Sequence, residues 1–312
     1  MRLHVADARR ELCSRLIFAI GAVAHSSLFI MFWLILVSLI WAFSFGLIKN
    51  HLAGLDPTAL ATVRLAFALL VFLPFLRRCG VTLRQGARLA LIGAVQFGLM
   101  YALYLAAFRH IQAHEVALFT IFTPIYVTLF DSLLERRLRV RWLAAAALAA
   151  LGAGVLLWQR TNSATLLQGF LLMQGSNACF AFGQIAYKRL RPALPAQRDS
   201  AFFAWLLAGG FAATAAYSGY GTDWTAFHPT ATQWGVLLYL GAVASGVGFF
   251  LWNRGALLVN TGTLAVFNNL KIPLGVVCSL LFFSEKADFA RVAASFAILS
   301  VAAWLAERKQ KT

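Results

Sequence analysis

LAVFNNLKIPLGVVCSLLFF, residues 264–283, is long enough to cross a bilayer as a helix, yet it carries a lysine near its middle. About 20 residues of α-helix cover about 30 Å, the thickness of a bilayer's hydrocarbon core. Lys271 would therefore lie near the bilayer centre, where a charge costs about 3 kcal/mol and normally faces a protein interior or an aqueous cavity. Asn268, Asn269 and Pro273 add two amides and a helix breaker at the same depth. We interpret this stretch as the floor of a substrate cavity.

The composition of the whole chain predicts a membrane protein. Of its 312 residues, 61% are hydrophobic and 12% are charged, which is outside the usual range for soluble domains. Runs of about 17 to 22 apolar residues, separated by short polar turns, are each long enough to span a bilayer. We therefore expect an all-α polytopic membrane protein with ten transmembrane helices, at residues 29–48, 58–76, 89–108, 116–134, 142–158, 167–187, 201–220, 234–252, 263–283 and 290–306.

The basic residues predict how the chain is oriented in the bilayer. A net charge of +16 could indicate nucleic-acid binding, but the Lys and Arg residues are spread over short loops between the apolar runs. Twenty of the 27 fall on the same side of the membrane as the N-terminus, and five fall on the opposite side. Because short cytoplasmic loops are enriched in Lys and Arg, we expect both termini in the cytoplasm and no nucleic-acid partner.

The first 28 residues stand apart from the ten apolar runs. Three arginines precede nine apolar residues and an Ala-x-Ala at 22–24, a pattern that imitates a signal peptide. Cleavage there would put the new N-terminus outside and reverse the Arg-rich loops. We interpret residues 1–28 as a dispensable extension, or as the product of a translation start placed too early, since Met31 directly precedes the first long run. Residues 307–312 form a basic cytoplasmic tail.

Three short motifs recur in the same order in the two halves of the chain. FSFG at 43–46 returns as FAFG at 180–183, GAVQFG at 93–98 returns as GAVASG at 241–246, and a proline in the fourth run matches one in the ninth. We expect two five-helix repeats, residues 29–158 and 159–306. An odd number of helices per repeat turns the second upside down, as in many secondary transporters. Chance similarity among apolar segments is the alternative.

Several longer strings resemble a known family. They are WAFSF at 41–45, LVFLPFLR at 70–77, LFTIFTP at 118–124, FAFGQIAYKRL at 180–190, VASGVG at 243–248 with WN at 252–253, and GTLAVFNN at 262–269. The ten-helix plan resembles the drug/metabolite transporter superfamily, and these strings look like those of the enterobacterial biotin transporters in its EamA family. The resemblance runs from about residue 38 to 275. It implies a bacterial-type inner-membrane transporter with a central cavity between the repeats.

Polar and aromatic side chains at mid-depth supply candidates for that cavity. Aromatic walls with a few placed donors suit a ring-containing ligand. The alternative is that individual polar side chains hold helices together, at about 0.6 kcal/mol per hydrogen bond, and that aromatics fill space. Thr120, Ser176 and Gln184 are expected to hold helices together. The candidate substrate-binding residues are Lys271, Asn268, Asn269, Asn177, Gln96, Tyr101, Tyr104, Trp41, Thr123 and Tyr126.

Two other charged positions receive a separate interpretation. Arg64 lies within the second run and Glu115 begins the fourth on the same predicted side, so an ion pair between them is available. We assign these two residues, together with Pro124 and Pro273, structural or coupling roles. Asp131 is expected to be solvated, or paired with the two arginines that follow it. No carboxylate then remains at mid-depth, which leaves Lys271 without a permanent counter-ion.

The remaining motifs argue against an enzyme or a channel. The four cysteines lack metal-ligand spacing, the six histidines lie at helix ends and in loops, and there is no HExxH or GxSxG sequence. We therefore expect no catalytic residues, no metal and no cofactor. A channel needs rings of charge or a carbonyl filter, and one buried lysine provides neither.

Transport of a small molecule across the lipid bilayer is the function that we expect. Import of biotin or a similar carboxylate-bearing ring compound is favoured, and this assignment rests on the family resemblance. Export of amino acids or other metabolites, which EamA relatives also perform, is the alternative, because the sequence does not decide the direction.

Overall fold

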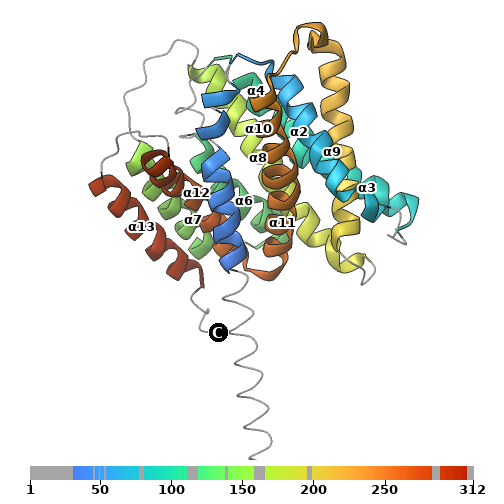
Figure 1. Cartoon of the computed structure of the whole chain (residues 1–312). Helices are drawn as coiled ribbons and strands as arrows, with labels where there is room; N and C mark the ends of the chain where they lie inside the picture. Colours follow the sequence, from blue (N-terminus) through green and yellow to red (C-terminus); the bar gives the residue numbers. More distant parts are fainter. Residues whose placement is uncertain are drawn as a thin grey trace, which may run out of the picture.

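The computed structural model describes an all-helical protein (Figure 1). The described residues are 31–44, 46–48, 50–52, 54–76, 81–107, 109–110, 119–137, 140–157, 166–194, 199–282 and 289–307. The expected extension 1–28, the candidate Glu115 and the tail beyond Glu307 lie outside these ranges. No strand occurs within them.

The first half of the chain begins with the helix Met31–Ile48. It continues with α2 (Pro57–Leu76), and then with α3 (Leu83–Gly93), which runs through a π-helical segment, Ala94–Leu99, into α4 (Met100–Ala107). A 3₁₀ turn, Thr120–Phe122, leads into α6 (Thr123–Glu135), and α7 (Val140–Leu157) follows.

The second half contains the same kinds of element in the same order. After α8 (Leu166–Leu190) and α9 (Asp199–Gly221), α10 (Ala231–Leu238) runs through a π-helical segment, Tyr239–Val247, into α11 (Gly248–Leu258). The described chain ends with α12 (Thr261–Phe282) and α13 (Phe289–Glu307). Short 3₁₀ turns lie at Arg191–Ala193 and Trp224–Ala226.

Five helical stretches of the described chain are long and apolar enough to cross a membrane. They are Met31–Ile48, Pro57–Leu76, Leu83–Ala107, Asp199–Gly221 and Ala231–Leu258. A helix overlaps every one of the other predicted ranges as well. In α8 the apolar character is lowered by glutamines and asparagine in the middle of the helix, and polar residues in the middle of a buried membrane helix commonly serve a site or a helix contact.

Capping boxes start two of the helices at matching places in the two halves. The Thr82 hydroxyl accepts a hydrogen bond from the backbone of Gln85, whose side chain accepts one from the backbone of Thr82, and this begins α3. Thr230 and Gln233 begin α10 in the same way. Each box satisfies two amides that a helix start leaves without partners. The two boxes are separated along the chain by the same number of residues as the GAVQFG and GAVASG motifs. These motifs overlap the two π-helical segments.

The helices pack in two groups with α8 between them. In one group, α2 contacts α9 and the segment Tyr239–Val247, while α9 contacts α3 and the segment Ala94–Leu99. In the other group, α7 contacts α13, α12 and α6. Figure 1 shows α13, α7 and α12 on one side of the molecule and α2, α9 and α3 on the other. Since α8 contacts both α4 and α6, it joins the groups at the centre.

Glycines permit close approaches between helices of the first group, and Gly93 and Gly241 are two of them. A Cβ on Gly93 would lie 1.8 Å from the carbonyl oxygen of Leu206, so α3 and α9 touch through their backbones. A Cβ on Gly241 would lie 2.9 Å from the carbonyl oxygen of Arg64 and 2.5 Å from Cβ of Phe67, on α2. Small residues at such crossings bring helices together in a bilayer, where hydrophobic burial contributes little to helix association.

Gly93→Ala and Gly241→Ala should therefore destabilise the protein. Forcing a methyl group into a packed contact costs about 1–3 kcal/mol, and we expect a lower unfolding temperature in detergent for both variants. The matched control is Gly235→Ala, because a Cβ there has no atom within 4 Å and alanine is the better helix former. Equal stability of the Gly93→Ala and Gly235→Ala proteins would contradict the packing described here.

Candidate functional site

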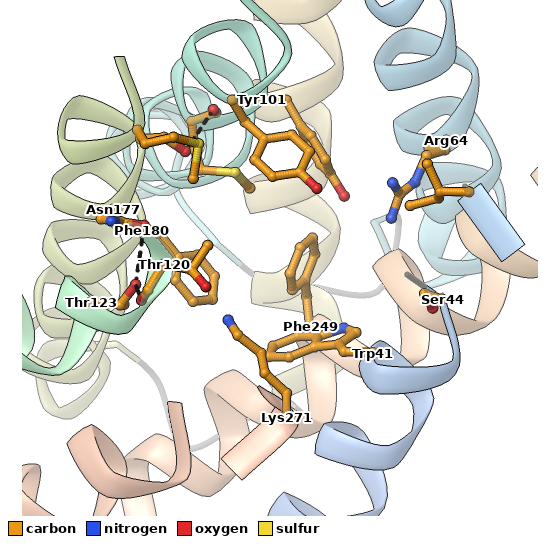
Figure 2. Close-up of a pocket in the computed structure, with 15 residues that line it drawn as sticks. Trp41, Ser44, Arg64, Tyr101, Thr120, Thr123, Asn177, Phe180, Phe249 and Lys271 are labelled. Carbon is orange, nitrogen blue, oxygen red and sulfur yellow. Dashed lines mark hydrogen bonds between the residues drawn. The ribbon is translucent and has the colours of Figure 1, made fainter. Parts of the chain in front are cut away.

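A cavity of about 120 Å³ lies where the first helix, α2, α4, the start of α6, α8, α11 and α12 meet (Figure 2). Its wall is largely aromatic and aliphatic, with a few polar groups and two cations. Cavities of this kind hold small molecules by apolar contact and orient them by placed donors. The lining residues are Trp41, Ser44, Ile48, Arg64, Met100, Tyr101, Tyr104, Thr120, Thr123, Met173, Ser176, Asn177, Phe180, Phe249 and Lys271.

The ammonium group of Lys271 reaches this cavity from α12. The residue is 9% exposed, and Nζ lies 5.6 Å from the centroid of the Trp41 ring. Trp41 is fixed in turn, because its Nε1 donates a 2.9 Å hydrogen bond to the Ala244 carbonyl. Among the residues that the structure describes, no carboxylate lies within 4 Å of Nζ. A cation–π contact compensates a desolvated charge only partly, by about 2 kcal/mol, so this ammonium is suited to bind an anion.

Arg64 brings a second cation to the same cavity. Its Nη2 donates to Ser245 Oγ at 3.2 Å, and the guanidinium lies 5.1 Å from the centroid of the Tyr101 ring. The Tyr101 hydroxyl is itself 3.3 Å from Ser245 Oγ. The expected partner, Glu115, is outside the described residues. Within the described part of the chain, the buried Nε of Arg64 has no hydrogen-bond acceptor.

Asn177 and Thr123 form the polar side of the wall, between α8 and the start of α6. Asn177 Nδ2 donates to the Phe119 carbonyl at 2.7 Å. The Thr123 hydroxyl is 2.8 Å from the Thr120 carbonyl and 3.1 Å from Asn177 Oδ1. Pro124 occupies the first turn of α6, where its missing N–H has no helical acceptor to lose. These contacts fix the helix start against the cavity.

Aromatic rings pack against one another along the remaining wall. Trp41 contacts Phe180, Phe249 and Trp252, with ring centroids 6.2, 5.4 and 5.0 Å apart. Tyr101 and Tyr104 meet edge to face at 6.2 Å. Such contacts leave the rings little freedom, and the apolar wall is therefore largely preformed for a flat ligand.

Comparisons with known proteins place this chain in a family of transporters. The sequence profile of the EamA-like transporter family matches residues 28–158. A protein of Pseudomonas aeruginosa named "Probable biotin transporter" is 41% identical over 290 residues, covering 88% of this chain and 96% of its own. Proteins named "Biotin transporter" from Salmonella typhimurium and Escherichia coli are 38% identical over 275 residues, covering 87% of this chain and 91% of theirs.

The chain belongs to the EamA-like transporter family. It is a multi-pass membrane protein, and the relatives that it matches are named as transporters rather than enzymes. A solved crystal structure of another protein superposes with a TM-score of 0.74 at 18% identity, over 89% of this chain and 96% of that chain. At that identity the likeness shows that the two chains share a fold, and no more.

Four of the expected binding residues of this EamA protein do not line the cavity. Gln96 and Asn253 exchange amide hydrogen bonds of 2.9 and 3.3 Å, which use the polar groups of both side chains. Asn268 donates to the carbonyl of Leu264 one turn earlier in α12, and Asn269 donates to the carbonyl of Ile121. Tyr126 stacks on Phe130 of the same helix. Pro273, for which a structural or coupling role is expected, lies inside α12.

Other lining residues were assigned differently by sequence, or not at all. Thr120 and Ser176, expected to hold helices together, both line the cavity, although Ser176 also donates to the Met100 carbonyl at 3.1 Å. Ser44, Ile48, Met100, Met173, Phe180 and Phe249 were not among the candidates. For Phe180 a signal existed, because it begins the repeated FAFG motif.

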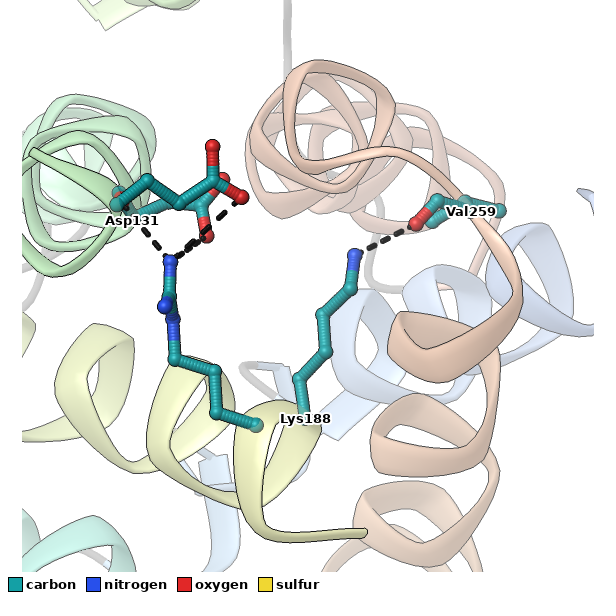
Figure 3. Close-up of polar contacts among 5 residues, drawn as sticks. Asp131, Lys188 and Val259 are labelled. Atoms are coloured by element: carbon teal, nitrogen blue, oxygen red, sulfur yellow. Dashed lines mark hydrogen bonds and ion pairs between the residues drawn. The ribbon is translucent and has the colours of Figure 1, made fainter. Parts of the chain in front are cut away.

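Ionic and polar contacts join helices near one end of the bundle (Figure 3). Arg189 of α8 lies 3.2 Å from the carboxylate of Asp131 and 3.6 Å from that of Glu135, both on α6. The adjacent Lys188 donates to the carbonyl of Val259, between α11 and α12, at 2.8 Å. We call this group the end latch. Asp131 is 5% exposed, so of the two expected states, solvated or paired, it is paired. Its ion-pair partner is not one of the two arginines that follow it but comes from α8, because that helix end crosses α6.

Proposed function

We propose that this EamA protein takes up biotin, or a similar small ring compound with a carboxylate, across a bacterial-type inner membrane. The observation that carries the proposal is the buried Lys271 ammonium, which faces an aromatic cavity with no described carboxylate beside it. A substrate carboxylate would supply the missing counter-charge, and the rings of Trp41 and Phe249 would pack on an apolar ring system. The names of the relatives support biotin as that compound.

The same geometry weighs against amino-acid export. An amino acid carries an ammonium group as well as a carboxylate, and a buried ammonium needs an anion or several acceptors. The described cavity wall instead presents two cations, Lys271 and Arg64, and no carboxylate. A second positive charge in this space would be repelled. A monoanionic acid without an amine suits the wall better.

We propose further that the chain spans the membrane ten times as two inverted repeats, with both termini in the cytoplasm. Support comes from devices that recur in order in the two halves: a capping box, a π-helical segment and a glycine contact. Both halves supply walls of the cavity, with Arg64 and Tyr101 from the first half and Asn177 and Lys271 from the second. Binding near the midplane at a repeat interface is typical of secondary transporters.

We propose that transport is by alternating access, and the position of the end latch supports this. In the proposed topology, Asp131, Glu135 and Arg189 lie on the cytoplasmic side of the cavity. Arg189 joins the second repeat to α6 of the first, so rocking of one repeat against the other would break these contacts. The buried amide of Gln184, which has no hydrogen-bond partner within the described chain, lies about 8 Å along α8 from Arg189. Opening of that end would give it solvent.

Arg189→Gln should shift the carrier toward the conformation that is open at this end. A partly exposed ion pair contributes up to about 1 kcal/mol, which is about fivefold in a conformational equilibrium. The reporter is a Gln184→Cys substitution in protein whose own cysteines are replaced by serine. We expect this cysteine to react about fivefold faster with a small thiol reagent when Arg189→Gln is also present. Arg191→Gln is the matched control, because it removes an ion pair with Asp199 inside the second repeat. Equal reaction rates in the Gln184→Cys protein and in its Arg189→Gln and Arg191→Gln variants would show that the end latch does not hold this end shut.

Uptake of radiolabelled biotin tests the proposed substrate and its direction. Cells that can neither synthesise nor import biotin should accumulate the label when they express this chain, and unlabelled biotin should compete. Amino-acid efflux from the same cells should not change. Wild-type protein that reaches the membrane but gives no biotin uptake would contradict the proposal, and increased amino-acid efflux would favour the export alternative.

Lys271→Met should abolish recognition of the carboxylate. Removing one partner of a buried charge pair costs about 2–5 kcal/mol, or about 30- to 4,000-fold in affinity. We expect wild-type protein to bind biotin much better than biotin methyl ester, Lys271→Met to lose that preference, and Lys271→Arg to keep part of it. The exposed Arg88→Met on α3 serves as the control. Retention of both affinity and acid preference by Lys271→Met would place the carboxylate elsewhere.

A further inference from the structure

We infer that Arg64 is a second specificity-determining residue, which binds a carbonyl oxygen on the ring end of the substrate while Lys271 binds its carboxylate. The inference rests on the proposed function and extends it. It makes the cavity a two-point site whose substrates carry an anionic group at one end and a cyclic urea or amide carbonyl at the other.

The position of the guanidinium group supports this role. Arg64 lines the cavity, and Figure 2 shows it entering from a different side than Lys271, with Phe249 in view between the two cations and Trp41 beside Lys271. The face of the guanidinium is held by the Tyr101 ring, and Nη2 is held by Ser245. These contacts restrict the side chain from two directions. Its donors are therefore preorganised rather than free to follow a ligand.

The donors of Arg64 are only partly used. A guanidinium carries five N–H groups. In the described chain one hydrogen bond to Ser245 is formed, and the buried Nε–H has no acceptor. Because Nε is buried, a ligand oxygen in the cavity would accept from the terminal N–H groups that Ser245 leaves over, and a hydrogen bond to a charged group contributes about 1.5–3 kcal/mol. Arg64 therefore lets the protein distinguish a ligand that has a hydrogen-bond acceptor at this place from a ligand that lacks one.

The chemistry of the two cations assigns the two ends of the substrate. Lys271 has neither a hydrogen bond nor an ion pair among the described residues, so it has the greater need of a full negative charge. Arg64 already contacts a hydroxyl and a tyrosine ring, and a neutral carbonyl oxygen satisfies a remaining N–H. The aromatic wall between the two cations suits the hydrocarbon part of such a molecule. Biotin, with a carboxylate on its side chain and a urea carbonyl on its ring, has this pattern.

Competition binding with matched probes tests the inference. Purified protein would be assayed with labelled biotin against desthiobiotin, which keeps the carboxylate and the cyclic urea, and against 6-cyclopentylhexanoic acid, in which a hydrocarbon ring replaces the urea. A hydrogen bond to a charged group contributes about 1.5–3 kcal/mol, so wild-type protein should prefer desthiobiotin about 10- to 150-fold. Arg64→Met should reduce this preference to about threefold or less, while the preference for acid over methyl ester persists.

Lys271→Met should give the opposite result, losing the preference for acid over ester and keeping the preference for the urea. The exposed Arg254→Met on α11 should change neither. If Arg64→Met does not fold, Arg64→Lys replaces it, because lysine keeps the charge but lacks the forked donors, and the urea preference should again fall. Ser245→Ala, which releases Nη2, should lower the same preference by a smaller factor.

Two results would overturn the inference. In the first, a folded Arg64 variant keeps the full urea preference. In the second, it loses the preference for acid over ester instead, which would place the carboxylate on Arg64. Failure of the wild type to bind either biotin or desthiobiotin would be a different result, because it would remove the proposed function itself before any question about Arg64 arises.

Discussion

The ammonium of Lys271, held within an apolar helix bundle, is the constraint on which the arrangement of the site depends. A charge at this depth needs a polarisable ring, an anion or water beside it. In the described chain it has the face of Trp41, and Trp41 is held by a carbonyl of the segment Tyr239–Val247. The site therefore links α12 to the first helix, and through the first helix to the segment Tyr239–Val247.

Close helix crossings supply the rigid frame around that charge. The glycine contact of Gly93 with α9 and that of Gly241 with α2 bring backbones together at two corresponding crossings. Both glycines lie beside or within a π-helical segment, where an extra residue per turn changes which side chains face inward. The frame places Ser245, from the segment Tyr239–Val247, beside Arg64 of α2. Packing and recognition thus share the same elements.

The sequence predicted the class of the protein better than the direction in which each side chain points. Lys271, Trp41, Tyr101 and Asn177 were expected at the cavity and lie there. Gln96 was expected there too, but it lies in a π-helical segment and pairs with Asn253. Helices that are apolar all round have no marked polar face to reveal their rotation.

The sequence also did not predict which side chains from distant helices contact one another. Asp131 is followed by two arginines, yet its ion-pair partner is Arg189, 58 residues away along the chain. Sequence neighbours at a helix end compete with residues brought in by packing, and only the crossing of α6 and α8 decides between them. The sequence around Phe249 does not distinguish it from the other phenylalanines of the core. Its place in the wall follows from the way its helix packs.

A structure of the protein with bound biotin tests the central claim most directly. We predict a carboxylate oxygen within about 2.7–3.2 Å of Lys271 Nζ, with the rings of Trp41 and Phe249 against the body of the ligand. A carboxylate bound away from Lys271, with its ammonium still facing only Trp41, would contradict the account.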